Sequence, residues 1–455
     1  MNLNTLQAFR HGLYACLQRA ADALFNTADA LLSQTPGQSF AQLSLSPFFE
    51  RGWPSLYEAF QDGRIATDQL EELFATFAPK PSPGEAMLLG LDSSSIARPL
   101  SPTAADRTAV HMSNLPPDCT PVAPGWQFSA LMLLPKVPSS WDYLLSHRRI
   151  ASTQTAGQVG AEQLRALIPR LGLADGERAI MLADRGYSNA PFLRASHDVA
   201  CDKLIRLAKN RVLYRPAPAR TGQRGAPCKD GPRFKCDAPQ THGPPDRVWE
   251  GQDDKGHRLL VEAWEQLHFK QARDIEATVI RVTRFGAAES ARDPRVSWFL
   301  WVGQAPAPLA LVCSLYKRRS CQEHGYRFHK QSLLWDRPRL RTPEQFERWT
   351  LLVAAVHNQL VVARPLVAAV RLPWESPTRP VTPQQVRRAM AAILAILGTP
   401  AQARHPSAEN RRAGPKVESG PLPHAFRSSK KPHPCPQSVA NGLKLTFFSP
   451  RMSLS

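Results

Sequence analysis

The sequence lacks the cysteine spacing of a zinc-binding protein. Its 8 cysteines include no Cys-x2-Cys pair, and Cys228 and Cys236 near His242 do not have the spacing of zinc ligands. We therefore expect reduced, structural thiols.

A long uninterrupted apolar run is also missing. The most apolar stretch, residues 349–370, contains His357, Arg364 and Pro365 among other breaks, which favours a core helix over a membrane span. The first 25 residues carry charges and amides throughout, instead of the short apolar core of an export signal. We predict no membrane partner and a cytoplasmic protein.

Acidic residues are few relative to basic ones. The chain has 57 Lys and Arg against 38 Asp and Glu, a formal net charge of +19. Such an imbalance favours a polyanion as partner, so we expect binding to nucleic acid and association with the nucleoid; a merely soluble basic protein is the alternative. With 455 residues, the chain is long enough for two or three domains around a full hydrophobic core.

Apolar spacing divides the chain into segments. Helical intervals between Leu6 and Leu31, and a second helix from Thr67, predict a helical amino-terminal domain, which either caps the core or binds DNA ends. The runs AMLLGLD, FSALMLL, RAIMLAD and KLIRLA, with a helix near residues 161–171, predict an α/β core. Two further helices are predicted before Pro365 and after Thr382.

About 140 residues separate Asp184 from Glu323 (323 − 184), too many for a simple connection, so an inserted subdomain is expected. Residues 210–245 are rich in Pro, Gly, Lys and Arg, typical of a basic loop along phosphates or of a solvated linker. Four β-branched and aromatic runs follow and predict strands. Trp249 and Trp264 can stack on a displaced base, although packing in a core is the stronger interpretation.

The resulting boundaries cover the whole chain. We predict a helical domain at 1–80, the first part of the core at 81–209, the basic loop and β-rich insertion at 210–303, the second part of the core with two helices at 304–398, and a basic disordered tail at 399–455.

Two of the predicted strands end in aspartate. MLLGLD ends at Asp92 and AIMLAD ends at Asp184, each followed by turn-forming residues. A single such aspartate is usually a turn former or helix cap. Two of them at strand ends, joined by Glu323, form a set of hard oxygen ligands that would repel one another without Mg²⁺ or Mn²⁺ between them.

The segment YKRRSCQEHGYRFHK carries Tyr316, Arg319, Glu323 and Lys330. On a helix these positions fall within an arc of roughly 60°, at about 100° per residue. A phenol, a guanidinium, a carboxylate and an ammonium on one face suit a phosphodiester and a metal, whereas a solvated face with ion pairs is the plain alternative. Arg327 falls on the same arc, and Gly325 is a point where the helix can break.

Taken in order, Asp92, Asp184 and the pattern Tyr-x2-Arg-x3-Glu-x6-Lys resemble the DDE insertion-sequence transposases over roughly residues 86–365. The resemblance implies an α/β fold: a ribonuclease H-like core interrupted by a β-rich insertion and preceded by helices. Asp92 is matched by its strand and its order. Asp106 and Asp175 lie outside apolar runs and are weaker candidates.

The resemblance also implies a mechanism. Two Mg²⁺ or Mn²⁺ ions held by Asp92, Asp184 and Glu323 would support cleavage at inverted-repeat ends and strand transfer into target DNA, which is cut-and-paste transposition. Tyr316, Arg319 and Lys330 would grip phosphates of double-stranded DNA, and a homodimer is expected on DNA.

Two other functions fit parts of the same pattern. A DNA-binding protein with a transposase-derived fold that no longer cleaves would tolerate the loss of a carboxylate, and all three are present. A ribonuclease H-like nuclease acting on RNA hybrids would use the same metals but leaves Tyr316, Arg319 and Lys330 unexplained.

Overall fold

The computed structural model describes most of the first 403 residues. The described ranges are 2–33, 39–99, 101, 103–111, 121–174, 177–219, 226–286, 294–367, 371–376 and 378–403. Most of the predicted basic tail, from residue 404, and the weaker candidate Asp175 lie outside these ranges.

Four helices form the amino-terminal part: α1 (Leu3–Cys16), α2 (Ala21–Ser33), α3 (Trp53–Asp62) and α4 (Thr67–Phe77). The helical spacing of leucines from Leu6 to Leu31 is interrupted between α1 and α2. There β1 (Leu17–Arg19) pairs with β2 (Arg64–Ile65), and Ala20 adopts a φ of 54°. The turn lets both helices bury their apolar faces, with Phe9 and Leu24 fully buried.

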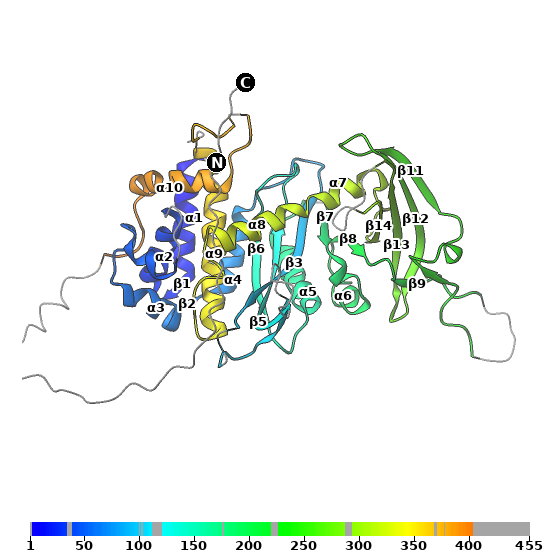
Figure 1. Cartoon of the computed structure of the whole chain (residues 1–455), viewed down its shortest axis with the longest axis horizontal. Coiled ribbons are helices and arrows are strands. Elements are labelled where there is room, and N and C mark those ends of the chain that lie inside the picture. Colours follow the sequence, from blue (N-terminus) through cyan, green and yellow to red (C-terminus); the bar gives the residue numbers. More distant parts are fainter. Residues whose placement is uncertain are drawn as a thin grey trace, which may run out of the picture. The chain divides into compact units, whose positions relative to one another are not determined.

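Helices from the other end of the described chain pack against this group (Figure 1). They are α9 (Pro343–Ala363) and α10 (Pro383–Leu397), and each begins with a capping box, at Thr342 and Thr382. Both predicted helices are therefore confirmed. Short 3₁₀ helices occur at η1 (Ala41–Leu45), η2 (Pro169–Leu171), η4 (Pro239–Thr241), η5 (Leu309–Leu311) and η6 (Arg364–Leu366).

Strands from the middle of the chain form a mixed sheet. Strand β3 (Met87–Ala97) pairs antiparallel with β5 (Val122–Leu133) and parallel with β7 (Ala179–Ala183). On the outer sides, β6 (Tyr143–Ile150) and β4 (Thr108–His111) pair with β5, and β8 (Asp202–Leu207) pairs in parallel with β7. All four apolar runs named above form strands, whereas β4 and β6 had no such signal.

The β-rich segment continues this sheet. It comprises β9 (Val212–Tyr214), β10 (Arg233–Lys235), β11 (Arg247–Gln252), β12 (Arg258–Phe269), β13 (Ala272–Arg284) and β14 (Val296–Val302). Because β14 pairs antiparallel with β8, strands β3–β14 join into one sheet of 12 strands (Figure 1). The four runs expected to be strands correspond to β11–β14.

Helices cover both faces of the sheet at β3. Successive residues of a strand face opposite sides. Leu91 packs against Gly160 in α5 (Ala156–Leu167), whereas Gly90 packs against Gln322 in α8 (Ser320–Gln331). Asp92 therefore faces the side of α8. The remaining helices are α6 (Ala190–Ala195), which contacts β13, and α7 (Val312–Lys317), which precedes α8 (Figure 1).

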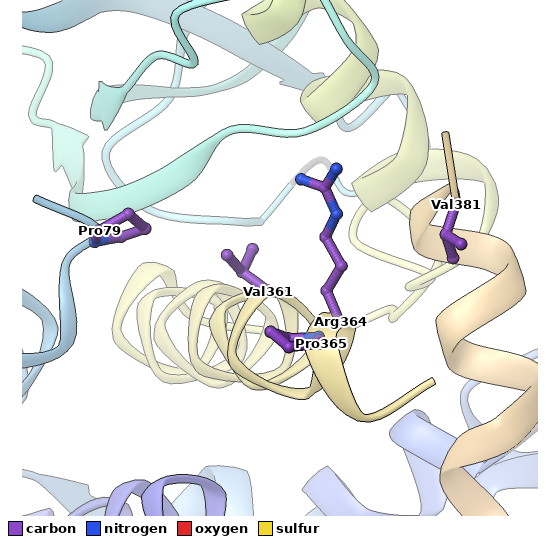
Figure 2. A pocket seen from close by; sticks show the side chains of 5 residues that line it. All are labelled: Pro79, Val361, Arg364, Pro365 and Val381. Carbon is purple, nitrogen blue, oxygen red and sulfur yellow. The ribbon is translucent and has the colours of Figure 1, made fainter. Parts of the chain in front are cut away.

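A cavity of about 340 Å³ lies near the end of α9, and none of its lining residues belongs to β3, β7 or α8. Figure 2 shows the Arg364 side chain extending beside Val361 and Pro365, with Pro79 and Val381 on either side. The Arg364 guanidinium lies over the Trp141 ring, and Trp141 Nε1 donates to the Val381 carbonyl at 2.7 Å. Within the described ranges, no helix combines the length and the apolar character needed to cross a membrane.

Candidate active site

Two aspartates lie side by side at the parallel ladder of β3 and β7. The register pairs Leu91 with Ala183, so the next residues along the two chains are Asp92 and Asp184. Their proximity appears in the electrostatics, because the charge of Asp184 contributes to a raised pKa of Asp92. The carboxylates predicted from separate strands are thus brought together by strand pairing.

The two aspartates have different backbone settings. β3 continues through residues 93–97, so the expectation that this strand ends at Asp92 is wrong. Pairing with β5 extends to Ala97 opposite Gly125 and keeps the serines in the ladder. Asp184, in contrast, ends β7 and caps the short η3 (Arg185–Tyr187), where its Oδ1 accepts a hydrogen bond from the Gly186 N–H at 2.8 Å.

Arg319 supplies the positive charge beside this pair. Its Nη2 lies 3.0 Å from Asp92 Oδ2, and the two side chains are only 15% and 14% exposed. Burial raises the pKa of Asp92, with Asp184 acting in the same direction and Arg319 opposing. Burial would lower the pKa of Arg319, but Asp92, Tyr316 and Asp184 outweigh it, so the pKa of Arg319 is raised.

Tyr316 and Arg319 do not share one continuous α-helix with Glu323. Helix α7 ends at Lys317 and α8 begins at Ser320, so the single-helix expectation is wrong at this point. Tyr316 remains close to the site. The centroids of the Tyr316 and Phe299 rings are 4.9 Å apart in an edge-on arrangement, and the Arg206 guanidinium lies 5.7 Å from the centroid of the Tyr316 ring. Burial raises the pKa of Tyr316, with Arg319 opposing.

The helix does not break at Gly325, since α8 runs through it to Gln331. The absence of a side chain lets the carboxylate of Asp142 approach the helix so closely that a Cβ at Gly325 would overlap with it. Gly325 therefore serves packing between α8 and the segment before β6.

Glu323 is exposed, whereas its neighbour Gln322 is fully buried against β3. Across the described ranges, no three His, Cys, Asp or Glu side chains are grouped so that they could hold a metal ion. The structure therefore unites two of the three predicted carboxylates and leaves the third, one helical turn after Arg319, facing solvent.

Lys330 is half-buried and fastens α8 to β3. Its Nζ donates to the Ser95 carbonyl at 3.2 Å and lies 5.6 Å from the centroid of the Trp335 ring. Burial lowers the pKa of Lys330, and Asp336 opposes this. Arg327, predicted on the same arc, is exposed.

Sequence reasoning missed Tyr326 and Gln322. The Tyr326 hydroxyl donates to the Asp92 carbonyl at 3.1 Å and fixes the backbone that carries this carboxylate, while Gln322 packs on Gly90. Gln322, Tyr326 and Lys330 recur every four residues, which is the spacing of one helix face. That interval, read without regard to charge, was the signal for the face that contacts β3.

A basic pocket of about 480 Å³ adjoins Asp184. Arg185, Arg206 and Lys209 line it with seven other residues, and none of the described lining residues is acidic. Arg206 Nη2 donates to Ser297 Oγ at 3.2 Å, which orients the guanidinium. The pocket is suited to an anion such as a phosphate.

The two candidate tryptophans differ in accessibility. Trp249 on β11 is half-buried. Trp264 on β12 is 1% exposed, packs with Phe234 and Trp298, and donates from Nε1 to the Gly243 carbonyl at 3.2 Å. A base would reach Trp264 only if this packing opened, so Trp264 is a core residue here.

Comparison with known proteins identifies the family. The family model described as DDE superfamily endonuclease matches residues 12–269, more than half of the chain. The chain therefore belongs to the DDE superfamily of endonucleases, and its mixed sheet flanked by helices is consistent with that nuclease fold. The matched segment contains Asp92 and Asp184 and ends before Glu323.

A comparison with curated proteins gives no match. Among solved structures, the cryo-EM structure of a piggyBac transposase synaptic complex with hairpin DNA is similar at 10% identity and a TM-score of 0.41. The similarity covers 90% of this chain and 78% of that chain. The four-residue signature and the type of mobile element stay predictions.

The donor set fits a divalent metal ion in part. Asp92 and Asp184 offer hard carboxylate oxygens at adjacent positions, the ligands that Mg²⁺ and Mn²⁺ prefer. Arg319 already lies beside this pair as a positively charged group, and a positive charge stabilises two neighbouring carboxylates in their ionised form. Glu323 would complete the set only after a change in its side chain or in α8.

Proposed function

We propose that the protein is a DDE transposase that cuts DNA at the inverted-repeat ends of an insertion sequence and joins those ends to target DNA. The observation that carries this proposal is the register of β3 and β7, which sets Asp92 beside Asp184 on the face covered by α8. Membership of the DDE endonuclease superfamily supports the same class of chemistry.

In this proposal Asp92, Asp184 and Glu323 are the catalytic carboxylates and hold two Mg²⁺ or Mn²⁺ ions. Such ions, when bound, activate a water or a 3′-hydroxyl and stabilise the leaving oxygen. The chain itself orients the carboxylates: β3 and β7 fix two of them, and the Tyr326 hydroxyl holds the Asp92 backbone. Glu323 projects from the helix whose amino-terminal cap, Arg319, touches Asp92.

We further propose that the face around this pair binds double-stranded DNA. Tyr316, Arg319, Arg327 and Lys330 would contact phosphates near the transposon end, and Trp249 would contact a displaced base. The basic pocket of Arg185, Arg206 and Lys209 supports this placement, because its charges adjoin Asp184. A homodimer on DNA and the domain boundaries given above belong to the same proposal.

One observation favours the second candidate function, a DNA-binding protein that no longer cleaves. The described residues hold two carboxylates together and leave Glu323 exposed. In that protein the basic residues would bind element ends, and metal would have no effect on the DNA.

Cleavage of a linear duplex that carries the element's own terminal repeats tests the proposal. In Mg²⁺ or Mn²⁺ the wild type should cut at the repeat ends, and Asp184→Asn or Glu323→Gln should lower the rate by about a hundredfold or more. Glu162→Gln is the matched control, because Glu162 is an exposed helical glutamate on α5. It should cut like the wild type.

A mobility-shift measurement on the same duplex separates the two candidates. Binding of the repeats with no cut in any metal would contradict the transposase and support the binding-only protein. Equal cutting by Glu323→Gln and the wild type would remove Glu323 from the catalytic set.

A further inference from the structure

Arg319 occupies an unusual position at the carboxylate pair. Its Nη2 is paired with Asp92, while its Nε is buried and has no hydrogen-bond partner within the described ranges. The guanidinium is thus desolvated without using its full hydrogen-bonding capacity, and such a group costs free energy. Attraction to Asp92 and to the nearby charge of Asp184 offsets this cost.

Two neighbouring carboxylates, of which Asp92 is only 14% exposed, favour a cation beside them. Arg319 supplies that charge from within the chain and uses Asp92 Oδ2, an oxygen that a metal ion would also need. A guanidinium and a divalent ion that both contact this oxygen would repel each other, so each would weaken the binding of the other.

We propose, on the basis of the function proposed above, that Arg319 is an internal counter-ion which competes with the divalent ion for Asp92 and leaves it for a DNA phosphate, so that metal and DNA bind cooperatively.

The surrounding contacts allow Arg319 to move while the site stays in place. Tyr326 holds the Asp92 carbonyl and Lys330 holds the Ser95 carbonyl, so α8 is attached to β3 at two points that do not involve Arg319. Arg319 lies at the junction of α7 and α8, before the first residue of α8, and its long side chain can turn without unwinding the helix.

A phosphate is a suitable destination for the guanidinium. An arginine binds phosphate with two parallel hydrogen bonds, which would also use the Nε that has no partner at Asp92. Exchange of one anion for another keeps the guanidinium paired, and it frees Asp92 Oδ2. Linkage then requires that DNA tightens metal binding and that metal tightens DNA binding by the same factor.

The test measures Mn²⁺ binding to the full chain by the electron paramagnetic resonance signal of free Mn²⁺, first without DNA. Arg319→Gln should bind Mn²⁺ about tenfold more tightly than the wild type, a factor typical of coupled sites. Arg319→Lys, which keeps the charge, should bind Mn²⁺ closer to the wild type. Arg165→Gln, the loss of an exposed cation on α5, should leave Mn²⁺ affinity unchanged.

The second arm adds the terminal-repeat duplex. DNA should tighten Mn²⁺ binding by the wild type about tenfold and should have much less effect on Arg319→Gln, in which the competition is already absent. A thermal unfolding curve without metal shows whether each variant is folded, and Asp184→Asn identifies binding at the carboxylate pair.

The outcomes separate this inference from the proposed function. Unchanged or weaker Mn²⁺ binding by Arg319→Gln, with still weaker binding by Asp184→Asn, overturns the counter-ion role and leaves the metal site intact. Tighter binding by Arg319→Gln in a protein that never cuts DNA supports the counter-ion role and contradicts the transposase. If neither the wild type nor Arg319→Gln binds Mn²⁺ at millimolar concentration, both fail.

Discussion

At the scale of single residues, three histidines are buried next to Tyr326. The ring centroids of His147 and His329 are 6.3 Å apart, and those of His329 and His357 are 4.8 Å apart. His357 Nε2 lies 2.8 Å from Asp142 Oδ1. His147 and His329 have no hydrogen-bond partner for either ring nitrogen in the part of the chain that the structure describes.

This burial makes stability depend on pH. It lowers the pKa of His147 to about 3, with Lys330 acting in the same direction, and it lowers the pKa of His329 well below its usual range. In the unfolded chain both titrate near about 6.5. Between these values only the unfolded chain binds the protons, so the stabilisation is present above about pH 6.5 and is lost as the pH falls toward 3.

We therefore expect the free energy of unfolding in urea to decrease between pH 7.5 and 5.5, by at most about 1.4 kcal/mol per pH unit for each histidine. His147→Leu should flatten this dependence. His324→Gln, the loss of an exposed histidine on α8, should leave the slope unchanged. The pKa of Asp92 is raised in the folded chain, so its contribution to the free energy of unfolding decreases as the pH rises, opposite to that of the histidines. An equal slope in His147→Leu and the wild type would contradict the assignment.

The residue types at the site were largely predictable, but their contacts were not. Asp92 and Asp184 were singled out as the aspartates that end two apolar runs, although only Asp184 lies at the end of its strand and β3 continues past Asp92. The ion pair between Arg319 and Asp92 joins residues 227 positions apart (319 − 92), and no local spacing encodes it. The exposure of Glu323 could not be predicted either. Helical spacing indicates which residues share a face of the helix, but it does not indicate which face is buried.

At the scale of elements, the packing of α8 against the core depends on Gly325. A Cβ there would meet the Asp142 carboxylate, which also pairs with His357. Gly325→Ala should therefore destabilise the fold by about 1–3 kcal/mol through overpacking, despite the better helix propensity of alanine.

Chemical denaturation of Gly325→Ala checks this expectation. Gly157→Ala in α5 is the matched control, because the nearest atom to its new Cβ is Phe192 Cβ at 3.3 Å, and the helical preference for alanine offsets this mild crowding. A loss at Gly157 as large as that at Gly325 would show that close approach of Asp142 is not the cause.

Elements with a strong local pattern were predictable, and those set by distant partners were not. The strand runs and the capped helices α9 and α10 follow from periodicity and Thr-x-x-Gln boxes. β6 was missed because Ser146 and His147 are polar yet buried; Ser146 Oγ donates to Glu71 in α4 at 2.6 Å. The break after α1 was missed because β1 finds its partner β2 beyond α3.

At the scale of the whole molecule, one buried ion pair links both ends of the described chain. Arg10 in α1 and Asp29 in α2 are 2% and 3% exposed and 2.6 Å apart. Arg10 also donates to Gln359 Oε1 in α9 and to the Gly398 carbonyl after α10, both at 3.1 Å. Four helices, two from each end, thus meet at a single guanidinium.

Arg10→Leu should lower the free energy of unfolding by about 3–5 kcal/mol, because it leaves the Asp29 carboxylate buried without a charged partner. The double variant Arg10→Leu with Asp29→Leu should lose less than the sum of the two single losses, as a urea double-mutant cycle would measure. Arg165→Leu, which removes an exposed pair with Asp198, should have little effect. Additive losses in the cycle would exclude coupling between Arg10 and Asp29.

The overall class was predictable from the sequence to the extent that net charge, strand-end carboxylates and family resemblance agree, and the family match bears out that class. The division into five segments stays a prediction. The order of strands in the sheet depends on pairing between distant segments, and no local pattern in the sequence predicts that β14 pairs with β8.

The direct pairing of β14 with β8 has a mechanical consequence. Five ladder positions, from Trp298 opposite Leu207 to Val302 opposite Lys203, couple the β-rich strands to the strand beside β7. A force on β14 is therefore carried as shear through backbone hydrogen bonds to β8 and then to β7, the strand that precedes Asp184. In the proposed function, a load that DNA places on β11–β14 would therefore reach the backbone beside the carboxylate pair through these ladders.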